Sequence, residues 1–257
     1  MSMRYLKLMK FRLIEQETHD AKMNMALDHI LLDSSPAIRF YKWKNNSISL
    51  GAYQNSEEVN LKECKKNNIE IVRRLTGGGA VLHTQKDLTY SFIAPIKLFN
   101  NDVSKAYTTV CSWIISTLSN LGISSVIKNK NDLMINNKKI SGNAAKIEGG
   151  IYLQHGTIIY DLNASLMPTL LNISKQDLLD NITSIKKQKD ISQEELYQSL
   201  KSSFSKDKDI SISKITSKEK TKAKKLIDSN YNNLDLNIDT SKLKFKGACF
   251  LGHDILN

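Results

Sequence analysis

Three consecutive glycines constrain this sequence more than any other feature. They lie in the stretch Arg73-Arg74-Leu75-Thr76-Gly77-Gly78-Gly79-Ala80-Val81-Leu82-His83, and they are three of the eleven glycines in the chain. Glycine costs backbone entropy, so a triplet is typical of a backbone that needs a positive φ or a close approach to another group. Exposed amides in such a turn can surround an anion, and a neighbouring guanidinium adds charge-assisted hydrogen bonds. The alternative is a glycine-rich β-turn between two strands with solvated arginines, and the triplet alone does not decide between the two.

Hydrophobic periodicity predicts the helices and strands. Residues 23–31 carry apolar side chains at helical spacing after a capping Asp20, and residues 103–118 repeat this pattern up to Gly122. Further helices are predicted at 61–66, 193–204 and 217–231, and strands at 4–14, 37–43, 47–50, 70–74, 88–95, 133–135, 138–140, 151–160 and 210–212. Strands with interspersed helices and no βαβ rhythm predict an α+β fold, with a mixed, largely antiparallel sheet flanked by helices.

The sequence also predicts the conformation of three connecting stretches. Asn136-Asn137 should turn a hairpin, because asparagine tolerates the left-handed conformation of a two-residue turn. Residues 141–144 (Ser-Gly-Asn-Ala) should then interrupt the chain, and residues 51–55 should form a loop polar enough to line a site.

Composition limits where the protein works and what it binds. No apolar run approaches the roughly 18 residues that span a bilayer, and the amino terminus lacks an apolar signal core, so we expect a cytoplasmic protein without a membrane partner. Cys64, Cys111 and Cys249 are odd in number and lack CxxC spacing, which favours reduced thiols over disulfides or a zinc site. The net charge of +11 comes from lysines spread along the chain, so it supports an acidic protein partner weakly and nucleic acid less.

Several common catalytic motifs are absent from the sequence. Leu82 occupies the last glycine position of GxGxxG, and GxxxxGK[ST] and GxSxG do not occur. The five histidines never adopt HxxxH or HxxH spacing, which argues against a histidine-held metal.

A second stretch, residues 131–144, carries polar groups of possible function. Lys139 ends a predicted hairpin just before a Ser-Gly pair, where its ammonium could stabilise a phosphate or an oxyanion, or could be one more surface lysine. Asp132 could hold a Mg²⁺ ion carried by a nucleotide, or could be only a turn residue. For His155 we favour a structural role, as a partly buried side chain whose hydrogen bonds are satisfied within the protein. For His83, lining a site and a structural role are equally favoured.

Taken together, the motifs resemble those of the lipoate-protein ligases, in the biotin/lipoate protein ligase superfamily. The resemblance rests on the order of Arg73-Arg74-x-Thr-Gly-Gly-Gly-Ala-Val-x-His83, Asn131-Asp132-Leu133, Lys139-x-Ser-Gly-x-Ala144 and His155-Gly-Thr157. Asn24, Asp28 and residues 51–55 extend it over about residues 5–235. It implies the mixed sheet shared with biotin ligases and class II aminoacyl-tRNA synthetases, with residues 1–190 as the catalytic core and 191–257 as a helical part of the same domain.

The resemblance also implies a reaction and the residues that serve it. Lipoate attacks the α-phosphate of ATP to give lipoyl-adenylate, and a lysine of a lipoyl-domain acceptor then takes the lipoyl group. Acceptors of this kind are the E2 subunits of 2-oxoacid dehydrogenases and the glycine cleavage H protein. Lys139 is implied as the catalytic residue. The implied nucleotide contacts are Arg74, Gly77, Gly78, Gly79, Ala80, Val81, Leu82, His83, Asn131, Asp132 (with Mg²⁺) and Lys139. The implied lipoate contacts are Arg73, Gly79, His83, Lys139 and His155.

Two departures leave alternatives open. Single-chain ligases of this family carry a further small C-terminal domain, and this sequence ends about where it would begin, so we expect a separate small partner subunit for adenylation. Related octanoyltransferases act on acyl-carrier or lipoyl-domain donors and use a cysteine shortly before the lysine motif, where this chain has Asn131-Asp132-Leu133. A transferase, a non-catalytic lipoyl-domain-binding protein and a biotin ligase remain the alternatives, and Cys249 and His253 have no assigned role.

Overall fold

The computed structural model describes residues 9–34, 36–128 and 131–232. Residues 4–8 of the first predicted strand, together with Cys249 and His253, lie outside this described part. None of the described helices combines the length and the apolar character that crossing a bilayer requires.

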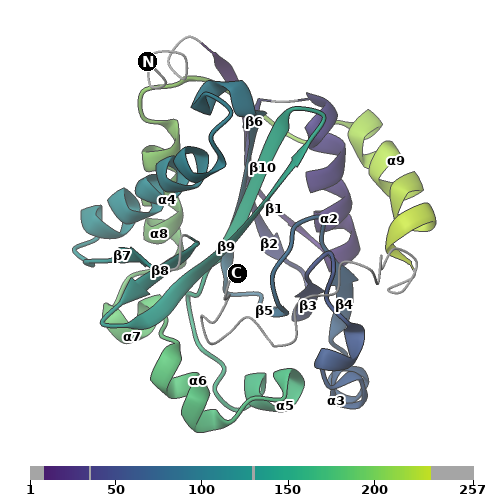
Figure 1. The fold of residues 1–257 in the computed structure, drawn as a ribbon, viewed down its shortest axis with the longest axis vertical. Helices are drawn as coiled ribbons and strands as arrows, with labels where there is room; N and C mark the ends of the chain where they lie inside the picture. The colour runs from purple at the N-terminus through teal and green to yellow at the C-terminus, as the bar shows by residue number, and fades with distance from the viewer. Residues whose placement is uncertain (1–8, 35, 129–130, 233–257) are drawn as a thin grey trace.

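An eight-stranded sheet forms the middle of the molecule (Figure 1). Its order is β11-β1-β2-β6-β10-β9-β8-β7, and only the β11–β1 and β1–β2 pairs are parallel. This confirms the prediction of a mixed, largely antiparallel sheet. The strands are β1 (Lys10–His19), β2 (Ala37–Trp43), β6 (Leu88–Pro95), β7 (Val126–Lys128), β8 (Asp132–Ile135), β9 (Lys138–Glu148), β10 (Ile151–Ile158) and β11 (Asp209–Ser213).

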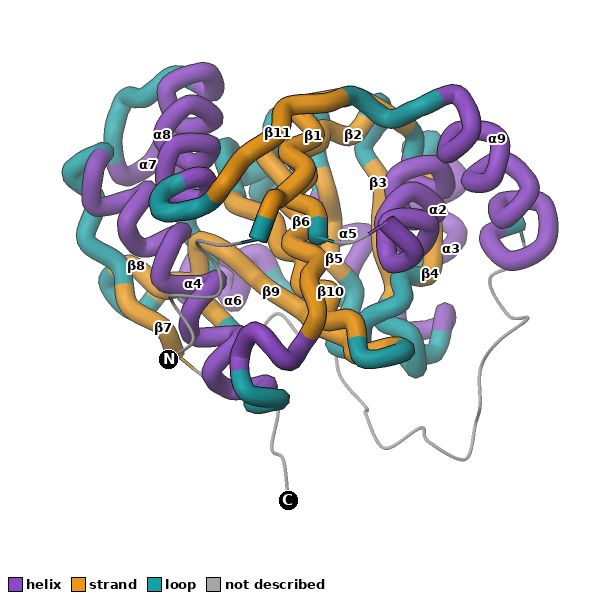
Figure 2. Tube along the Cα trace, turned by 90° about the horizontal axis from the view of Figure 1, so that it is seen from above, coloured by secondary structure: helices purple, strands orange, loops and turns teal. Residues whose placement is uncertain are grey.

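Helices cover both faces of this sheet (Figure 2). On one face α4 and α8 pack together, and on the other face α2 and α9 pack together. The α-helices are α2 (Ala21–Ile30), α3 (Leu61–Lys66), α4 (Val103–Asn120), α5 (Met167–Leu171), α6 (Lys175–Asn181), α7 (Ile185–Gln188), α8 (Gln193–Ser205) and α9 (Ser217–Leu226). Shorter helical segments are η1 (Leu31–Ser34), η2 (Ser56–Glu58), η3 (Ile96–Phe99) and the π-helical η4 (Ile227–Tyr231).

The central strands are apolar at successive positions because both of their faces are covered. Successive side chains of a strand point to opposite faces. Phe92 of β6 therefore packs in the core under α4 and α8, whereas the next residue, Ile93, packs in the core under α2 and α9. Tyr152 and Leu153 of β10 divide in the same way. This double burial makes the middle of the sheet a rigid support for side chains at its edge.

A second, three-stranded sheet has the order β4-β3-β5. Its strands are β4 (Glu70–Arg73), β3 (Ser47–Leu50) and β5 (Val81–His83). β3 is parallel to β4 and antiparallel to β5. Ile48 and Leu50 of β3 pack with the apolar side chains of α3, α5 and α6.

Two predicted boundaries are wrong. Residues 141–144 do not interrupt the chain, because they continue β9: all four pair with β10, and Ser141 and Gly142 also pair with β8. The local Ser-Gly signal is thus overridden by two ladders of hydrogen bonds. The first strand, predicted to end at residue 14, continues to His19, because a bulge after Ile14 restores the pairing of β1 with β2.

Helix α9 is attached to β1 by an ion pair that should make its docking pH-dependent. Arg12 donates to both carboxylate oxygens of Glu219, and Glu219 also completes a capping box with Thr216. Burial raises the pKa of Glu219, but the hydrogen bonds from Arg12 and Thr216 outweigh it and lower the pKa from 4.5 to about 2. Because the folded pKa is below the ordinary value, this contribution is complete above pH 4.5 and is lost as pH falls towards 2.

We therefore expect the free energy of unfolding to fall more steeply between pH 5 and pH 3 in the unmodified chain than in Glu219→Gln. Urea unfolding at a series of pH values measures this difference. Equal pH dependence of the two proteins would contradict the assignment.

Candidate active site

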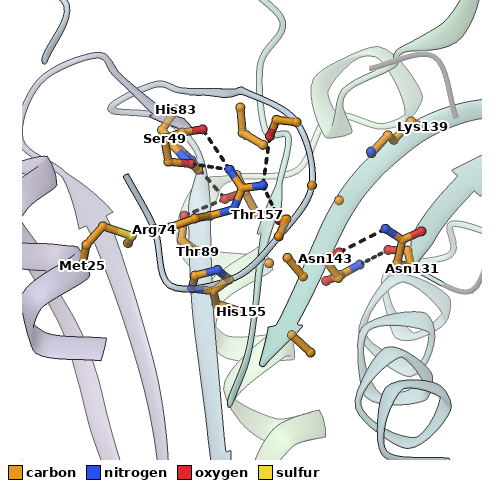
Figure 3. Close-up of a pocket in the computed structure, with 18 of the residues that line it drawn as sticks. Met25, Ser49, Arg74, His83, Thr89, Asn131, Lys139, Asn143, His155 and Thr157 are labelled. Atoms are coloured by element: carbon orange, nitrogen blue, oxygen red, sulfur yellow. Dashed lines mark hydrogen bonds between the residues drawn. The ribbon is translucent and has the colours of Figure 1, made fainter. Parts of the chain in front are cut away.

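A cavity of about 390 Å³ opens between β9, β10 and the glycine segment, which we define as residues 74–80 (Figure 3). Its walls combine aromatic rings, small residues and a few polar side chains. The lining residues are Met25, Tyr41, Trp43, Ser49, Arg74, Gly77, Gly78, Gly79, Val81, His83, Thr89, Tyr107, Asn131, Lys139, Gly142, Asn143, Ala144, Ala145, His155, Gly156 and Thr157. Such a mixture suits a ligand with an apolar body and one polar or charged end.

The glycine segment is not the turn of a hairpin. β4, which precedes it, and β5, which follows it, pair with opposite edges of β3 and not with each other. The segment must therefore cross over the end of β3. This finding removes the simpler alternative of a glycine-rich β-turn between paired strands.

Glycine is required where this crossing passes the end of β3. Gly51 follows β3, and a Cβ atom placed on it would lie 1.7 Å from the carbonyl oxygen of Gly78, which itself has φ of 92°. A Cβ on Gly77, in contrast, would meet nothing within 4 Å. The two backbones are thus packed together with no room for a side chain at residue 51.

We expect Gly51→Ala to lower the free energy of unfolding by about 1–3 kcal/mol, because the added methyl group must displace the glycine segment. The matched change Gly77→Ala should alter it by less than about 0.5 kcal/mol. Urea unfolding of both variants measures the difference. Equal stability of the two would show that residues 51 and 78 are not in close contact.

Arg74 holds the glycine segment through hydrogen bonds to its carbonyl oxygens. Its guanidinium donates to the carbonyl oxygens of Ser49, Gly77 and Gly79 at 2.6–2.9 Å. In a trans peptide the C=O and N–H groups point in opposite directions. The amides of Gly78 and Ala80 therefore point away from the guanidinium.

Arg73 contacts a different part of the chain from Arg74. It donates to the carbonyl oxygens of Gly51 and Gln54 at 2.8 and 2.6 Å and so fixes the loop of residues 51–55. No residue of that loop is among the residues that line the cavity. The loop supports the glycine segment from behind, and the expectation that it lines a site is wrong for this cavity.

His83 forms part of one wall and is held neutral. Its ring stacks on Trp43 at 3.9 Å between centroids and hydrogen-bonds to the hydroxyls of Ser49 (2.8 Å) and Thr157 (3.1 Å). Burial, followed by the electrostatic effects of Arg74 and His155, lowers the pKa of His83 well below its ordinary value. A neutral imidazole fits an apolar ligand chain better than an imidazolium would.

His155 connects the glycine segment to a buried ion pair. It hydrogen-bonds to the Thr76 hydroxyl at 2.7 Å and to Asp28 at 3.1 Å. Asp28 is paired with the fully buried Arg39 at 2.8 Å and accepts a hydrogen bond from Ser91. Burial raises the pKa of Asp28, but the hydrogen bond from His155 and the charge of Arg39 outweigh it and lower the pKa. Asp28 is therefore ionised at neutral pH.

Lys139 reaches the cavity because β9 contains a bulge. Lys139 pairs with Met134 and Ser141 pairs with Leu133, so Ile140 is an extra residue that redirects the strand. The side chain then passes over Gly142, where an added Cβ would lie 2.9 Å from the Cε atom of Lys139. Its ammonium pairs with Asp132 at 2.7 Å. The bulge, the glycine and the aspartate together fix one positive charge at the cavity wall.

A smaller cavity of about 50 Å³ lies on the other side of Lys139. The two cavities share Val81, Lys139, Gly142 and Thr157 as walls. The remaining walls of the smaller one are Leu82, Thr84, Asp87, Ile159, Asp161, Leu162, Asn163 and Met167. Lys139 therefore stands where the aromatic-lined cavity meets a smaller compartment lined by both apolar and polar side chains.

Most of the predicted site residues come together around these two cavities. The structure places Arg74, Gly77, Gly78, Gly79, Val81, Leu82, His83, Asn131, Lys139 and His155 on their walls. Arg73, Ala80 and Asp132 are not wall residues: they contact wall residues or lie next to them in the chain.

The aromatic residues of the cavity were not singled out from the sequence. Tyr41 and Trp43 are two apart on β2, so a strand assignment already puts them on one face. Only the fold shows that this face meets the glycine segment. Asn143 of β9 exchanges hydrogen bonds with Asn131, which directly precedes β8, and no local pattern indicates this pair.

The described part of the chain offers little thiol or metal chemistry. Its two cysteines, Cys64 and Cys111, are buried, and burial raises the pKa of their thiols to about 11 and about 12. Neither lines a cavity described above. Within the same residues, no cluster of three or more histidine, cysteine, aspartate or glutamate side chains could hold a metal ion. Asp132 supplies one carboxylate beside Lys139, which suits a Mg²⁺ bound mainly by phosphate oxygens.

Comparison with known proteins adds the following similarities. Residues 20–205 match the family described as lipoyl protein ligase A/B catalytic domain. The chain is 31% identical over 208 residues to the octanoyltransferase LipM of Brevibacillus brevis, covering 67% of this chain and 75% of that protein.

Two solved structures are also similar. The crystal structure of lipoate-protein ligase A bound with ATP has a TM-score of 0.80 at 27% identity, covering 90% of this chain and 100% of that one. A bi-partite lipoate protein ligase from Thermoplasma acidophilum, studied with its E2 lipoyl domain, has a TM-score of 0.80 at 26% identity, covering 90% and 96%.

Proposed function

Because the chain belongs to the lipoyl protein ligase A/B catalytic-domain family, we propose that it is a lipoate-protein ligase. It activates lipoate with ATP to give lipoyl-AMP and transfers the lipoyl group to a lysine of a lipoyl-domain acceptor. The position of Lys139, on the wall shared by the aromatic-lined cavity and the smaller one, is the observation that carries this proposal. In an acyl-adenylate the acyl chain and the nucleotide are joined by a mixed anhydride, which would lie beside Lys139.

The walls of the cavities suggest how the two halves would be placed. The acyl chain lies along Met25, Tyr41 and Trp43 in the larger cavity, and the nucleotide lies on the side of Val81 and Leu82. Amides of the glycine segment that point away from Arg74 donate to phosphate oxygens, as backbone amides do in other anion-binding turns. Lys139 then faces the mixed anhydride, where the bond between the carboxylate oxygen and phosphorus forms in the first step and the bond between the carbonyl carbon and that oxygen breaks in the second.

Lys139 acts by charge and not by proton transfer. Its ammonium orients the lipoate carboxylate towards the α-phosphate and stabilises negative charge on the phosphate as pyrophosphate leaves. In the second step it polarises the anhydride carbonyl for attack by the acceptor lysine, and AMP departs. A fixed charge in a site that excludes water stabilises such transition states because it needs no reorganisation.

Mg²⁺ would contribute charge neutralisation of the nucleotide phosphates, with Asp132 as the protein carboxylate nearest to Lys139. We place the reaction in the cytoplasm, where ATP is available and thiols such as Cys64 and Cys111 stay reduced.

A separate small subunit for adenylation is part of the proposal. It is supported by the similarity to the bi-partite ligase from Thermoplasma acidophilum. The match with this chain covers 96% of that solved chain. The acceptor is a lipoyl domain of the E2 or H-protein kind, and the net charge of +11 would favour an acidic acceptor surface.

The second candidate function is octanoyl transfer, which the similarity to LipM octanoyltransferases supports. Such an activity needs a thiolate at the cavity if it proceeds through an acyl-cysteine. The sequence has no cysteine between residues 112 and 248, and neither described cysteine lines the cavity. We therefore rank ligase above transferase.

Mass spectrometry of an apo-lipoyl domain tests the choice. The chain is incubated with the domain and either lipoate plus ATP-Mg²⁺ or octanoyl-acyl carrier protein, in each case with and without the small subunit. The ligase reading predicts a lipoyl adduct only where ATP is present. An octanoyl adduct formed without ATP, together with an acyl-cysteine on the chain, would favour the transferase.

A further inference from the structure

A buried series of hydrogen bonds ends at the wall of the larger cavity. The Tyr152 hydroxyl donates to Oε1 of Gln154 at 2.6 Å, and Nε2 of Gln154 donates to the Tyr90 hydroxyl at 2.8 Å. That hydroxyl donates to Oδ1 of Asn143 at 2.7 Å, and Nδ2 of Asn143 donates to the carbonyl oxygen of Asn131 at 2.8 Å. We call these five residues the Tyr90 network. The first three are fully buried and line neither cavity of the candidate active site, whereas Asn143 and Asn131 are wall residues.

The direction of the hydrogen bonds in this network is fixed by the backbone. A carbonyl oxygen only accepts hydrogen bonds, so the group of Asn143 that faces Asn131 must be its amide nitrogen. Oδ1 of Asn143 then faces Tyr90, whose hydroxyl must donate its single proton there. Burial raises the pKa of Tyr90 well above its ordinary value, so the hydroxyl keeps this proton. Gln154 must in turn donate to the Tyr90 oxygen, and each link has one orientation.

Gly156 makes the hydrogen bond between Tyr90 and Asn143 possible. It is the residue of β10 that pairs with Tyr90 of β6 on one side and with Asn143 of β9 on the other. Side chains of directly opposed residues lie on the same face of a sheet, so Tyr90 and Asn143 meet over the glycine. A Cβ atom on Gly156 would lie 2.0 Å from Oδ1 of Asn143 and 2.8 Å from Cε1 of Tyr90. A side chain at this position would therefore displace the bond.

At its other end the Tyr90 network extends the pairing of β8 with β9. Nδ2 of Asn131 donates to the carbonyl oxygen of Asn143 at 3.3 Å, so the two residues exchange hydrogen bonds (Figure 3). They lie directly beyond the pair Asp132 and Gly142, where the backbone ladder ends. Asp132 follows Asn131 in the chain and forms the ion pair with Lys139. The position of the Lys139 ammonium therefore depends on how firmly residue 131 is held.

We propose that Tyr90 and Asn143 are positioning residues of the transfer reaction. They act on Lys139 through Asn131 and Asp132 and contribute no charge or proton of their own. This inference rests on the proposed function, because Lys139 is the group that they place. A fixed charge is effective only in register with the reacting atoms, and a displacement of about 1 Å can lower a rate on the order of 100-fold. Losing one link of the network should cause part of this loss.

Tyr90→Phe tests the inference, because it removes one hydroxyl and keeps the ring. The assay is single-turnover transfer from preformed lipoyl-adenylate to an apo-lipoyl domain. We expect the maximal rate to fall about tenfold, while the acceptor concentration at half-maximal rate changes less than about twofold. Tyr160→Phe is the matched control. Tyr160 is also buried, donates to the carbonyl oxygen of Ile191 at 2.8 Å and lines neither cavity, so its variant should transfer at the unmodified rate.

A second background separates positioning from a loss of stability. In Asn143→Ala the Tyr90 hydroxyl has no route to residue 131, so adding Tyr90→Phe should slow transfer by less than about twofold. A hydroxyl that served only the stability of the core would have the same effect in both backgrounds. Equal slowing by Tyr90→Phe in the two backgrounds, or a rate for Tyr90→Phe equal to that of Tyr160→Phe, would overturn the inference.

Hydrogen exchange of the backbone amides of residues 131–135, measured by mass spectrometry, needs no reaction. Exchange should be faster in Tyr90→Phe than in the unmodified chain and unchanged in Tyr160→Phe, because only the first hydroxyl holds the start of β8. If the unmodified chain transfers no lipoyl group from the adenylate, the proposed function fails, and hydrogen exchange still decides whether the Tyr90 network orders this segment. Unchanged exchange in Tyr90→Phe would overturn the inference.

Discussion

Replacing Lys139 with methionine should lower kcat/KM for lipoyl transfer by about 100- to 1,000-fold, because it removes the fixed positive charge from the point where negative charge develops. Methionine keeps the length and apolar stem of the side chain. The expected loss is therefore electrostatic and should appear with ATP plus lipoate and also with preformed lipoyl-adenylate. Transfer to an apo-lipoyl domain, followed by mass spectrometry, measures both.

The controls for this variant follow from the contacts of Lys139. Removing it leaves Asp132 without the 2.7 Å ion pair, so Asp132→Asn/Lys139→Met should be more stable than the single variant and equally inactive. Lys146→Met is the matched control, since Lys146 is on the same strand, pairs with Glu148 and does not line the cavities. Full transfer activity of Lys139→Met would contradict the catalytic role of this lysine.

Asp28→Ala should destabilise the fold by about 3–5 kcal/mol, because it leaves the charge of Arg39 buried without its partner. Asp28 and Arg39 are 1% and 0% exposed, and the same carboxylate also orders Tyr41, Ser91 and His155. Urea unfolding measures the loss. The effect should be larger than that of any other single substitution of an aspartate considered above.

An exposed aspartate of the neighbouring segment supplies the comparison. Asp33 lies 3.9 Å from Lys222 with a side chain 73% exposed, so Asp33→Ala should change the free energy of unfolding by less than about 0.5 kcal/mol. In the double variant Asp28→Ala/Arg39→Met the loss should be smaller than the sum of the two single losses, since no unpaired charge remains. Additive losses would mean that the two residues do not interact.

Local sequence signals were sufficient for many of the elements. The helix capped by Asp20, the strands at 37–43, 47–50 and 88–95, and the helix at 61–66 occur as predicted. Asn136 and Asn137 have φ of 49° and 59°, so both adopt the left-handed conformation that the hairpin prediction required. These features depend on residues within a few positions of one another.

Other features depend on pairing between distant residues, and the sequence did not indicate them. β9 continues through Ser141 and Gly142 because β8 and β10 both pair with it. The glycine segment crosses β3 instead of turning a hairpin because β4 and β5 take opposite edges of that strand. The Ile140 bulge that directs Lys139 into the cavity likewise appears only when the register of β8 and β9 is known.

The resemblance singled out residues that the structure places around the same cavities, where local patterns left their role undecided. Residues 73–83 alone were equally consistent with a ligand cradle and a plain turn, and Lys139 alone was one lysine among many. The structure brings both to one cavity and adds Tyr41 and Trp43, which no motif marked. It also shows that the two arginines make different contacts. Arg73 binds the loop of residues 51–55, and Arg74 binds the glycine segment.

The most direct test of the proposed function is single-turnover transfer from preformed lipoyl-adenylate to an apo-lipoyl domain. This measurement isolates the second step from any requirement for a separate adenylation subunit. We predict rapid appearance of the lipoyl adduct and AMP with the unmodified chain and with a variant in which all three cysteines are serine, and loss of both products with Lys139→Met. No transfer from the adenylate, together with transfer from octanoyl-acyl carrier protein that disappears in the cysteine-free variant, would contradict the account.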